Sequence, residues 1–191
     1  MKNQKSSKSE SHVMSLRMDN EMYKELDELS KKYEVNKSQI LKQAFEEWDS
    51  IKKHALEENL IIVGRPFLGK LLTHIEPQQI EELSKFTAKN LGAKIRFQLI
   101  DKDVNIEITR FLDFFIEGSG KKSFAWFNNI SYKFTEDEDV ILFGNHSVNH
   151  NFSLYVKGLL KHLILDLFDY QLREEDCRIS TNTIHLFFEK L

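Results

Sequence analysis

Hydrophobic and polar residues alternate over the first patterned segment of the chain, Val13 to Asp19. Because successive side chains of a β-strand point to opposite faces, this period of two predicts a short strand. One face would carry the hydrophobic side chains Met14, Leu16 and Met18. The opposite face would carry Val13, Ser15 and Arg17. A lone strand leaves both edges unpaired, so we expect it to pair with the same strand of a second subunit.

Two helical patterns follow, in which apolar residues recur at spacings of three and four. The first predicts a helix over about Asn20–Glu34, with Asp19 or Asn20 as its N-cap. The second predicts a helix from about Lys37 to at least Lys53. Its start, Asn36-Lys37-Ser38-Gln39, fits a capping box in which Asn36 caps and Gln39 returns the hydrogen bond. One strand and two helices bury little core alone, so this domain, residues 12–58, is expected to be a homodimer.

This order of elements, with a second helix that opens Asn-Lys-Ser-Gln-Ile-Leu-Lys-Gln-Ala, closely resembles the ribbon-helix-helix proteins of the Arc/MetJ/CopG type. The resemblance covers about Val13–Trp48. It implies a dimer in which the two paired strands form a β-ribbon that enters the major groove of double-stranded DNA. The connection Tyr33-Glu34-Val35 departs from the family pattern, because it lacks the glycine that is frequent there.

The resemblance also implies which residues contact DNA. The outward side chains of the ribbon contact bases, and the matching positions are Val13, Ser15 and Arg17. Arginine can form two hydrogen bonds to guanine, serine can donate or accept one, and valine offers an apolar contact to a thymine methyl. The start of the second helix contacts a phosphate in the family, and the matching positions are Asn36, Lys37 and Ser38. A plain helix cap explains Asn36 equally well.

The rest of the chain, residues 59–191, mixes helical and alternating patterns and predicts a C-terminal α+β domain. Helices are expected over 65–73, from Pro77 to Gly92, over 106–116, and over 152–170 with Asn151 as N-cap. Strands are expected over 60–64, 95–100 and 177–188, and a hairpin over 124–134 and 140–148 around an acidic turn. The β-β-α-β order at the end would suit a ferredoxin-like arrangement. The clustered aromatic residues between 111 and 127 would form a core or line a small-molecule pocket.

Composition narrows the class of protein. A hydrophobic fraction of 41% with only 2 Pro and 7 Gly predicts that most of the chain folds. No membrane-length apolar run and no signal-peptide pattern is present, which predicts a cytoplasmic protein with no membrane partner. The net charge of −3 does not by itself indicate nucleic acid. The lysines of residues 1–11 lie in a basic arm, expected to be disordered, that would contact phosphates or remain a solvated tail.

Other chemistry has weaker support. His146 and His150 are weak candidates for a metal site, since the His-x-His pair of the nickel-responsive members of this family is absent and no dense Cys/His cluster accompanies them. Histidines that fix a turn or lie on the surface are the alternative. No catalytic motif is present, so we expect neither an enzyme nor a cofactor.

The sequence thus favours a homodimeric, sequence-specific transcription regulator, acting as a repressor on a palindromic operator. The C-terminal domain would join dimers into tetramers or sense a small-molecule effector. The alternative is an antitoxin-like protein, or another interaction module, whose C-terminal domain binds a protein partner. Antitoxin tails are usually short and disordered before binding. By contrast, residues 60–191 have the pattern of a large prefolded domain.

Overall fold

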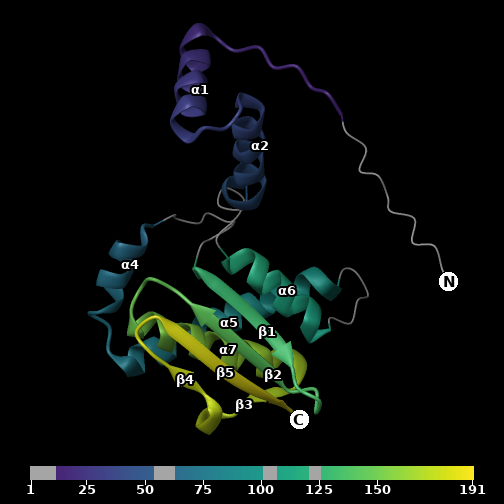
Figure 1. The fold of residues 1–191 in the computed structure, drawn as a ribbon. Coiled ribbons are helices and arrows are strands. Elements are labelled where there is room, and N and C mark those ends of the chain that lie inside the picture. Colours follow the sequence, from purple (N-terminus) through teal and green to yellow (C-terminus); the bar gives the residue numbers. More distant parts are fainter. Residues whose placement is uncertain (1–11, 54–62, 101–106, 121–125) are drawn as a thin grey trace, which may run out of the picture. The chain divides into compact units, whose positions relative to one another are not determined.

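The structure is a computed structural model that describes residues 12–53, 63–100, 107–120 and 126–191, drawn in Figure 1. The chain divides into two compact units, Met1–Glu46 and Glu47–Leu191. The first holds helix α1 (Asn20–Tyr33) and all but the last residue of α2 (Lys37–Glu47). The second holds an antiparallel sheet and four further α-helices among its described residues.

Helix α1 begins and ends with local hydrogen bonds that its sequence encodes. The Asp19 carboxylate accepts a hydrogen bond from the backbone N–H of Met22 at 2.8 Å, so Asp19 is the N-cap. After Tyr33 the chain turns through Glu34, whose φ of 54° lies in the left-handed region. The Ser30 hydroxyl donates to the Val35 carbonyl at 2.6 Å. These contacts form the turn without the glycine that the family usually has.

Helix α2 starts where the capping pattern predicts. The Asn36 side-chain oxygen accepts a hydrogen bond from the Gln39 N–H at 2.7 Å. The helix continues directly into a π-helical turn, η1 (Trp48–Lys52). Both predicted N-terminal helices are therefore confirmed.

The predicted N-terminal strand is not formed within the single chain. Residues 12–19 have no regular secondary structure in the described part of the chain. A strand is defined by hydrogen bonds to a neighbour, and the neighbour expected here is the same segment of a second subunit. The ribbon therefore stays a prediction.

The second unit is built on an antiparallel sheet in the order β1-β2-β5-β3. Its strands are β1 (Asn129–Phe134), β2 (Val140–Asn145), β3 (Tyr170–Leu172), β4 (Arg178–Ile179) and β5 (Thr183–Lys190). The pair β1–β2 is the predicted hairpin around the acidic turn. Strands β3 and β4 pair with opposite ends of β5, on either side of the short 3-10 helix η2 (Glu174–Asp176).

The single strand predicted over 177–188 is wrong, because a turn divides it into β4 and β5. The Ser180 hydroxyl oxygen accepts a hydrogen bond from the Thr183 N–H at 3.1 Å, and the Ser180 N–H donates to the Thr183 carbonyl at 2.9 Å. Strands β2 and β3 run parallel with β5 between them, connected through α7 as a split β-α-β unit. The ferredoxin-like arrangement is not confirmed beyond this unit.

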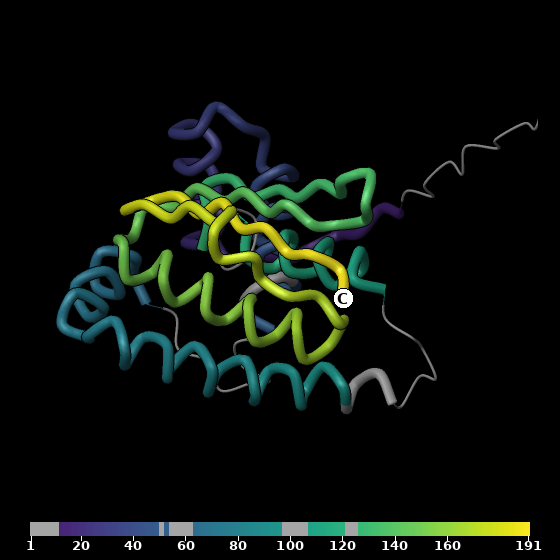
Figure 2. Tube along the Cα trace, turned by 90° about the horizontal axis from the view of Figure 1, so that it is seen from below, coloured from purple at the N-terminus to yellow at the C-terminus, as the bar shows by residue number. Residues whose placement is uncertain are grey.

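The helices of this unit are α4 (Arg65–Leu72), α5 (Pro77–Ile100), α6 (Ile108–Ser119) and α7 (His150–Phe168). Figure 2 shows α7 between the sheet and α5. Packed on two sides, α7 is apolar around most of its circumference. Its fully buried hydrophobic residues are Val156, Leu159, Leu160, Leu163 and Ile164.

Helix α5 does not end at Gly92, and no strand forms over 95–100; both predictions are wrong. A Cβ atom at Gly92 would lie 3.2 Å from the Asp166 carboxylate, and one at Gly158 would lie 2.7 Å from the Cβ atom of Ser84. Glycine therefore serves here to let α5 and α7 approach closely, rather than to end a helix. The 2.8 Å ion pair of Arg96 with Asp166 lies one turn further along α5.

The N-cap of α7 is Asn149, not Asn151 as predicted. The Asn149 side chain accepts from the Phe152 N–H at 3.0 Å and donates to the Gly69 carbonyl at 2.7 Å. Asn151 instead donates to the carbonyls of Leu72 and Ile75, at 2.7 and 2.9 Å. Both asparagines thus fix the end of α4 to the start of α7.

Other predictions for this unit have mixed outcomes. Helices α4 and α6 lie where the sequence predicts them. Most of the predicted strand 60–64 lies outside the described residues, as does Phe124. Phe111 and Phe127 are buried in the core and Trp126 packs against it, whereas Phe114 is 70% exposed. The aromatic cluster therefore belongs mainly to the core.

The close approach of α5 and α7 gives a first prediction. Gly158→Ala places a methyl group against Ser84 and should destabilise the protein by about 1–3 kcal/mol. The melting temperature should fall by roughly 2–4 °C for each kcal/mol. The matched control is Gly118→Ala in α6, where a Cβ atom meets nothing within 4 Å. That variant should melt at or slightly above the wild-type temperature. Equal melting of Gly158→Ala and wild type would contradict the packing account.

Candidate nucleic-acid interface

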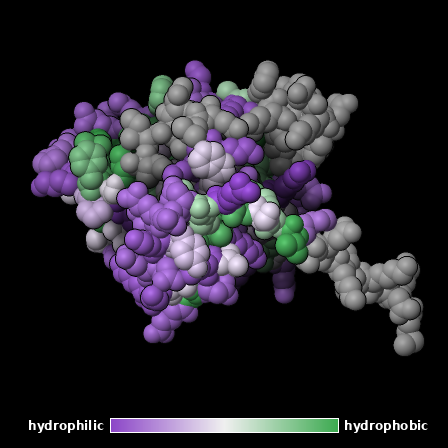
Figure 3. Space-filling model, turned by 90° about the horizontal axis from the view of Figure 1, so that it is seen from above, coloured by the Kyte–Doolittle hydropathy of each residue, from purple (hydrophilic) through white to green (hydrophobic). Residues whose placement is uncertain are grey.

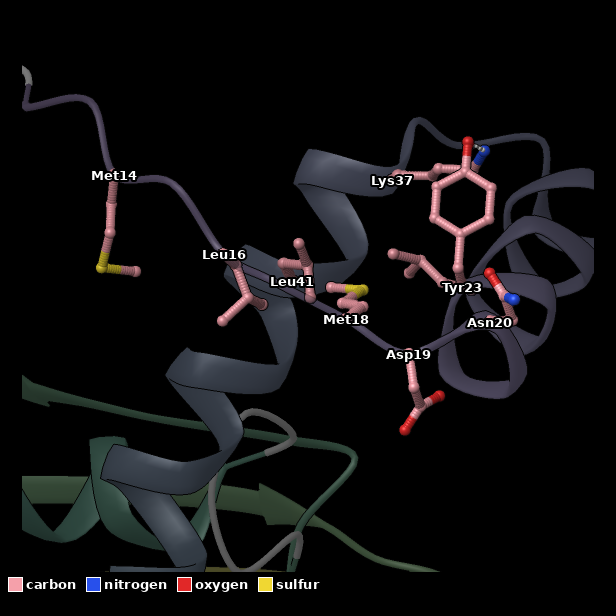
Figure 4. Close-up of a pocket in the computed structure, with 9 residues that line it drawn as sticks. Met14, Leu16, Met18, Asp19, Asn20, Tyr23, Lys37 and Leu41 are labelled. Atoms are coloured by element: carbon pink, nitrogen blue, oxygen red, sulfur yellow. Dashed lines mark hydrogen bonds between the residues drawn. The ribbon is translucent and has the colours of Figure 1, made fainter.

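Segment 12–19 and helices α1 and α2 enclose a groove of about 430 Å³ in the first unit (Figure 4). Segment 12–19 contributes Met14, Leu16 and Met18 to the hydrophobic lining of this groove. The two helices contribute Leu26 and Leu41, beside the Tyr23 ring. The other residues of the alternation, Val13, Ser15 and Arg17, are not part of the lining. The two-sided distribution predicted for a strand is therefore present along this segment.

The first unit leaves most of its hydrophobic side chains in contact with solvent. Among the described residues of 12–46, Leu26 is the only buried hydrophobic side chain. Met14 is 88% exposed and Leu16 is 61% exposed. The others that stay exposed between residues 20 and 46 are Met22, Tyr23, Leu29, Tyr33, Leu41 and Phe45. Green hydrophobic atoms are visible among purple hydrophilic ones on the molecular surface in Figure 3. Such surface is typical of a protein interface.

The three predicted base-contacting side chains, Val13, Ser15 and Arg17, are all exposed. Within the described residues, the Arg17 guanidinium forms neither an ion pair nor a hydrogen bond. Its five N–H donors are therefore available to an external acceptor.

The three predicted phosphate-contacting residues differ from one another. The Asn36 side chain is occupied as a helix cap. The Lys37 ammonium lies 2.6 Å from the Asp27 carboxylate and donates to the Tyr23 hydroxyl at 3.0 Å. Ser38 is exposed. In the described part of the chain, the backbone N–H groups of Lys37 and Ser38 have no hydrogen-bond partner, as is usual for the first turn of a helix.

The contacts of Lys37 were not predicted from the sequence. Hydrogen bonds from Lys31 and then Lys37 lower the pKa of Asp27 to about 2. The hydrogen bond to Asp27 raises the pKa of Lys37 in turn. The available signal was the spacing of Tyr23 and Asp27, which are four residues apart on α1 and so lie on one helix face. The Lys37 ammonium is thus held between the two helices, while the N–H groups at the start of α2 stay open.

His146 and His150 have different hydrogen-bond partners, although both connect to the Ser180 carbonyl, His146 through Ser153. His146 is buried, and its Nε2 lies 2.8 Å from the Ser153 hydroxyl, which donates its proton to the Ser180 carbonyl. Nε2 must therefore carry the proton, while Nδ1 accepts from the Val148 N–H at 3.3 Å. His150 is exposed, with Nδ1 3.3 Å from the Ser180 carbonyl. The described residues contain no group of three or more His, Cys, Asp or Glu that could hold a metal ion.

Comparison with known proteins agrees with the geometry of the first unit. The family described as "Ribbon-helix-helix protein, copG family" matches residues 12–48. This range contains segment 12–19, α1 and all of α2, and is thus a ribbon-helix-helix segment. Proteins with this segment are typically DNA-binding transcription regulators or antitoxins. No curated protein and no solved structure matches the chain. In the described part of the chain, no helix is long and apolar enough to span a membrane.

His146 gives a second prediction. Burial, and then the Arg65 guanidinium, lower the pKa of His146 to about 4. The unfolded chain binds this proton near pH 6.5, so stability is complete above that pH and is lost as the pH falls towards 4. Urea unfolding should show a free energy of unfolding about 2 kcal/mol lower at pH 5 than at pH 7.

The control for this experiment is His146→Gln, which keeps a polar side chain but has no proton to gain. Its free energy of unfolding should be lower than that of the wild type at pH 7, yet should change much less between pH 7 and pH 5. Identical pH dependence of the two proteins would show that another group causes the loss.

Proposed function

We propose that the chain is a homodimeric transcription regulator, acting as a repressor, that recognises a two-fold-symmetric operator through residues 12–19. The observation that carries the proposal is the two-sided distribution of side chains in this segment. Met14, Leu16 and Met18 line the groove with α1 and α2, while the alternate residues stay exposed. The ribbon-helix-helix match over 12–48 supports the same assignment.

We expect the first unit to dimerise because it buries so few of its hydrophobic side chains. A unit with one buried hydrophobic residue gains too little from burial to offset the entropy of ordering its chain. Antiparallel pairing of two 12–19 segments would give each strand a hydrogen-bonded edge. It would also bring a second copy over the exposed Met14 and Leu16 side chains. The same two-fold axis would duplicate Val13, Ser15 and Arg17 on one outer ribbon face.

That ribbon face has the chemistry to distinguish base pairs. Arg17 can form paired hydrogen bonds to guanine O6 and N7, and Ser15 can donate or accept one hydrogen bond. Because the Lys37 ammonium is held by Asp27, the phosphate contact would come from the Lys37 and Ser38 N–H groups at the positive end of the α2 dipole.

The second unit would join dimers into tetramers or sense a small-molecule effector. It has a continuous buried core within one chain. An antitoxin-like role is the second candidate, since the family includes antitoxins. The self-contained core of residues 47–191 favours the regulator over that alternative, because antitoxin tails usually fold on their partner.

The test of base recognition is Arg17→Ala. With the preferred duplex first selected from a random library, the variant should bind it at least tenfold more weakly, since each guanine contact is worth about 1–3 kcal/mol and the dimer loses two. Binding to a scrambled duplex should change little. Arg110→Ala, which removes an exposed arginine of the second unit, is the matched control and should bind as the wild type does. Undiminished discrimination by Arg17→Ala would exclude the ribbon as the recognition element.

The test of dimerisation compares Leu16→Lys with Val13→Lys. Both place a lysine in the same segment, but only Leu16 lines the groove. A charge in the dimer core should dissociate the first unit and abolish binding to any duplex, whereas Val13→Lys should stay associated. Sedimentation velocity at several concentrations measures the difference. The proposal fails if both variants associate as the wild type does.

A further inference from the structure

The sheet of the second unit has one face that no described helix of this unit covers. Figure 2 shows α7 and α5 on the same side of the sheet. Helix α6 also belongs to that side, because the Tyr132 hydroxyl, whose ring lies on the inner face, donates to Asp113 of α6 at 2.7 Å. The residues of β2 and β5 that point inward are fully buried. We call the opposite side, formed by the alternate residues of each strand, the outer face.

The two central strands carry aromatic rings on the outer face. Phe143 of β2 lies directly opposite His185 of β5, and Phe143 is 42% exposed. Residues paired in this way have Cβ atoms roughly 5 Å apart, so both side chains leave the same part of the outer face. Phe187 follows two residues along β5, and the Arg173 guanidinium covers its ring at 4.6 Å from the centroid. Phe143 is therefore the most exposed ring of this surface, and the half-buried His185 ring is its neighbour on β5.

Cationic side chains flank these rings on both sides. In the register of the sheet, the row that holds Phe143 and His185 ends at Arg178 of β4. Lys133 of β1 lies opposite Ile141, in the next row. Both cations are exposed, and neither forms an ion pair within the described residues. Glu189, the one carboxylate at an outward position of the described strands, pairs with Arg173 at 2.8 Å. The outer face is thus locally cationic in a protein of net charge −3.

We propose that the outer face binds single-stranded nucleic acid. One base would stack on Phe143 and its neighbour on His185, while Arg178 and Lys133 contact the phosphates on either side. Exposed aromatic rings with flanking cations are the two components of single-strand binding surfaces. Paired bases of a duplex keep their faces stacked inside the helix, so a duplex cannot use the two rings in this way. These four residues all belong to the second unit, so this inference does not rest on the duplex interface of residues 12–48.

A second copy of the chain suits this face less well. Its apolar centre is small, and the two sides of that centre carry Lys133 and Arg178. Two such faces packed against each other would bring these cations near one another, or bury them without a partner. A single strand instead supplies the negative charge that both cations lack.

The experiment titrates the full-length protein into fluorescein-labelled oligothymidine and oligouridine of equal length and follows fluorescence anisotropy. Wild type should bind at least one of them, and Phe143→Ala should bind roughly tenfold or more weakly through loss of one stacked base. His185→Ala is the second variant and should act in the same direction. Arg178→Ala should reduce the salt dependence of binding. Comparison of the two oligonucleotides shows whether the site prefers DNA or RNA.

Phe114→Ala is the matched control, because it removes an even more exposed phenyl ring, from α6 rather than from the outer face. It should bind as the wild type does, and thermal melting checks that every variant folds. Arg17→Ala should also bind single strands normally, which separates this inference from the duplex function. No binding by the wild type at roughly 0.1 mM, unchanged binding by folded Phe143→Ala and His185→Ala, or loss of binding in Arg17→Ala would each overturn the proposal. So would a fall in oligomeric mass caused by Phe143→Ala, which would show that a second copy covers the face.

Discussion

The properties of the first unit depend on one constraint: the unit does not bury most of its own hydrophobic side chains. Segment 12–19 presents Met14 and Leu16 to the groove, yet both stay largely exposed, and Leu26 alone is buried. Folding such a unit requires a second apolar surface, and the lone edge of the same segment requires a hydrogen-bonding partner. Both needs are met if two copies pair through residues 12–19. The pairing would also place the polar residues of the segment on one exposed surface, so dimerisation and DNA recognition would have the same origin.

The second unit differs, because its helices and strands bury one another's hydrophobic side chains within one chain. Helix α7 lies between the sheet and α5, and small residues such as Ser84 and Gly158 bring the two helices into close contact. Hydrogen bonds from Asn149 and Asn151 attach α4 to the same helix. Among the described residues of this unit, no helix covers the outer face of the sheet, and Phe143, Lys133 and Arg178 are exposed there.

Local patterns were sufficient where neighbouring residues decide the structure. The period of apolar residues and the caps at Asp19 and Asn36 predicted α1 and α2, and the acidic turn predicted the β1–β2 hairpin. The predictions from sequence were wrong where the structure depends on a residue that is distant in the chain. Gly92 resembles a helix end in the sequence, but its role is set by Asp166 on another helix. Likewise, the alternation of residues 13–18 indicated which side chains face the groove, whereas the contact of Lys37 with Asp27 depends on how two helices cross.

Amide hydrogen exchange of residues 13–18 in the 191-residue protein measures whether this segment completes its fold with a second copy. Pairing of two segments predicts slow exchange here at concentrations where the protein is a dimer, with alternate amides most protected, as in a two-stranded antiparallel ribbon. Protection should disappear on dilution, while the amides of the buried helix α7 stay protected. Exchange of residues 13–18 at the rate of an unstructured peptide in the concentrated protein would contradict the account.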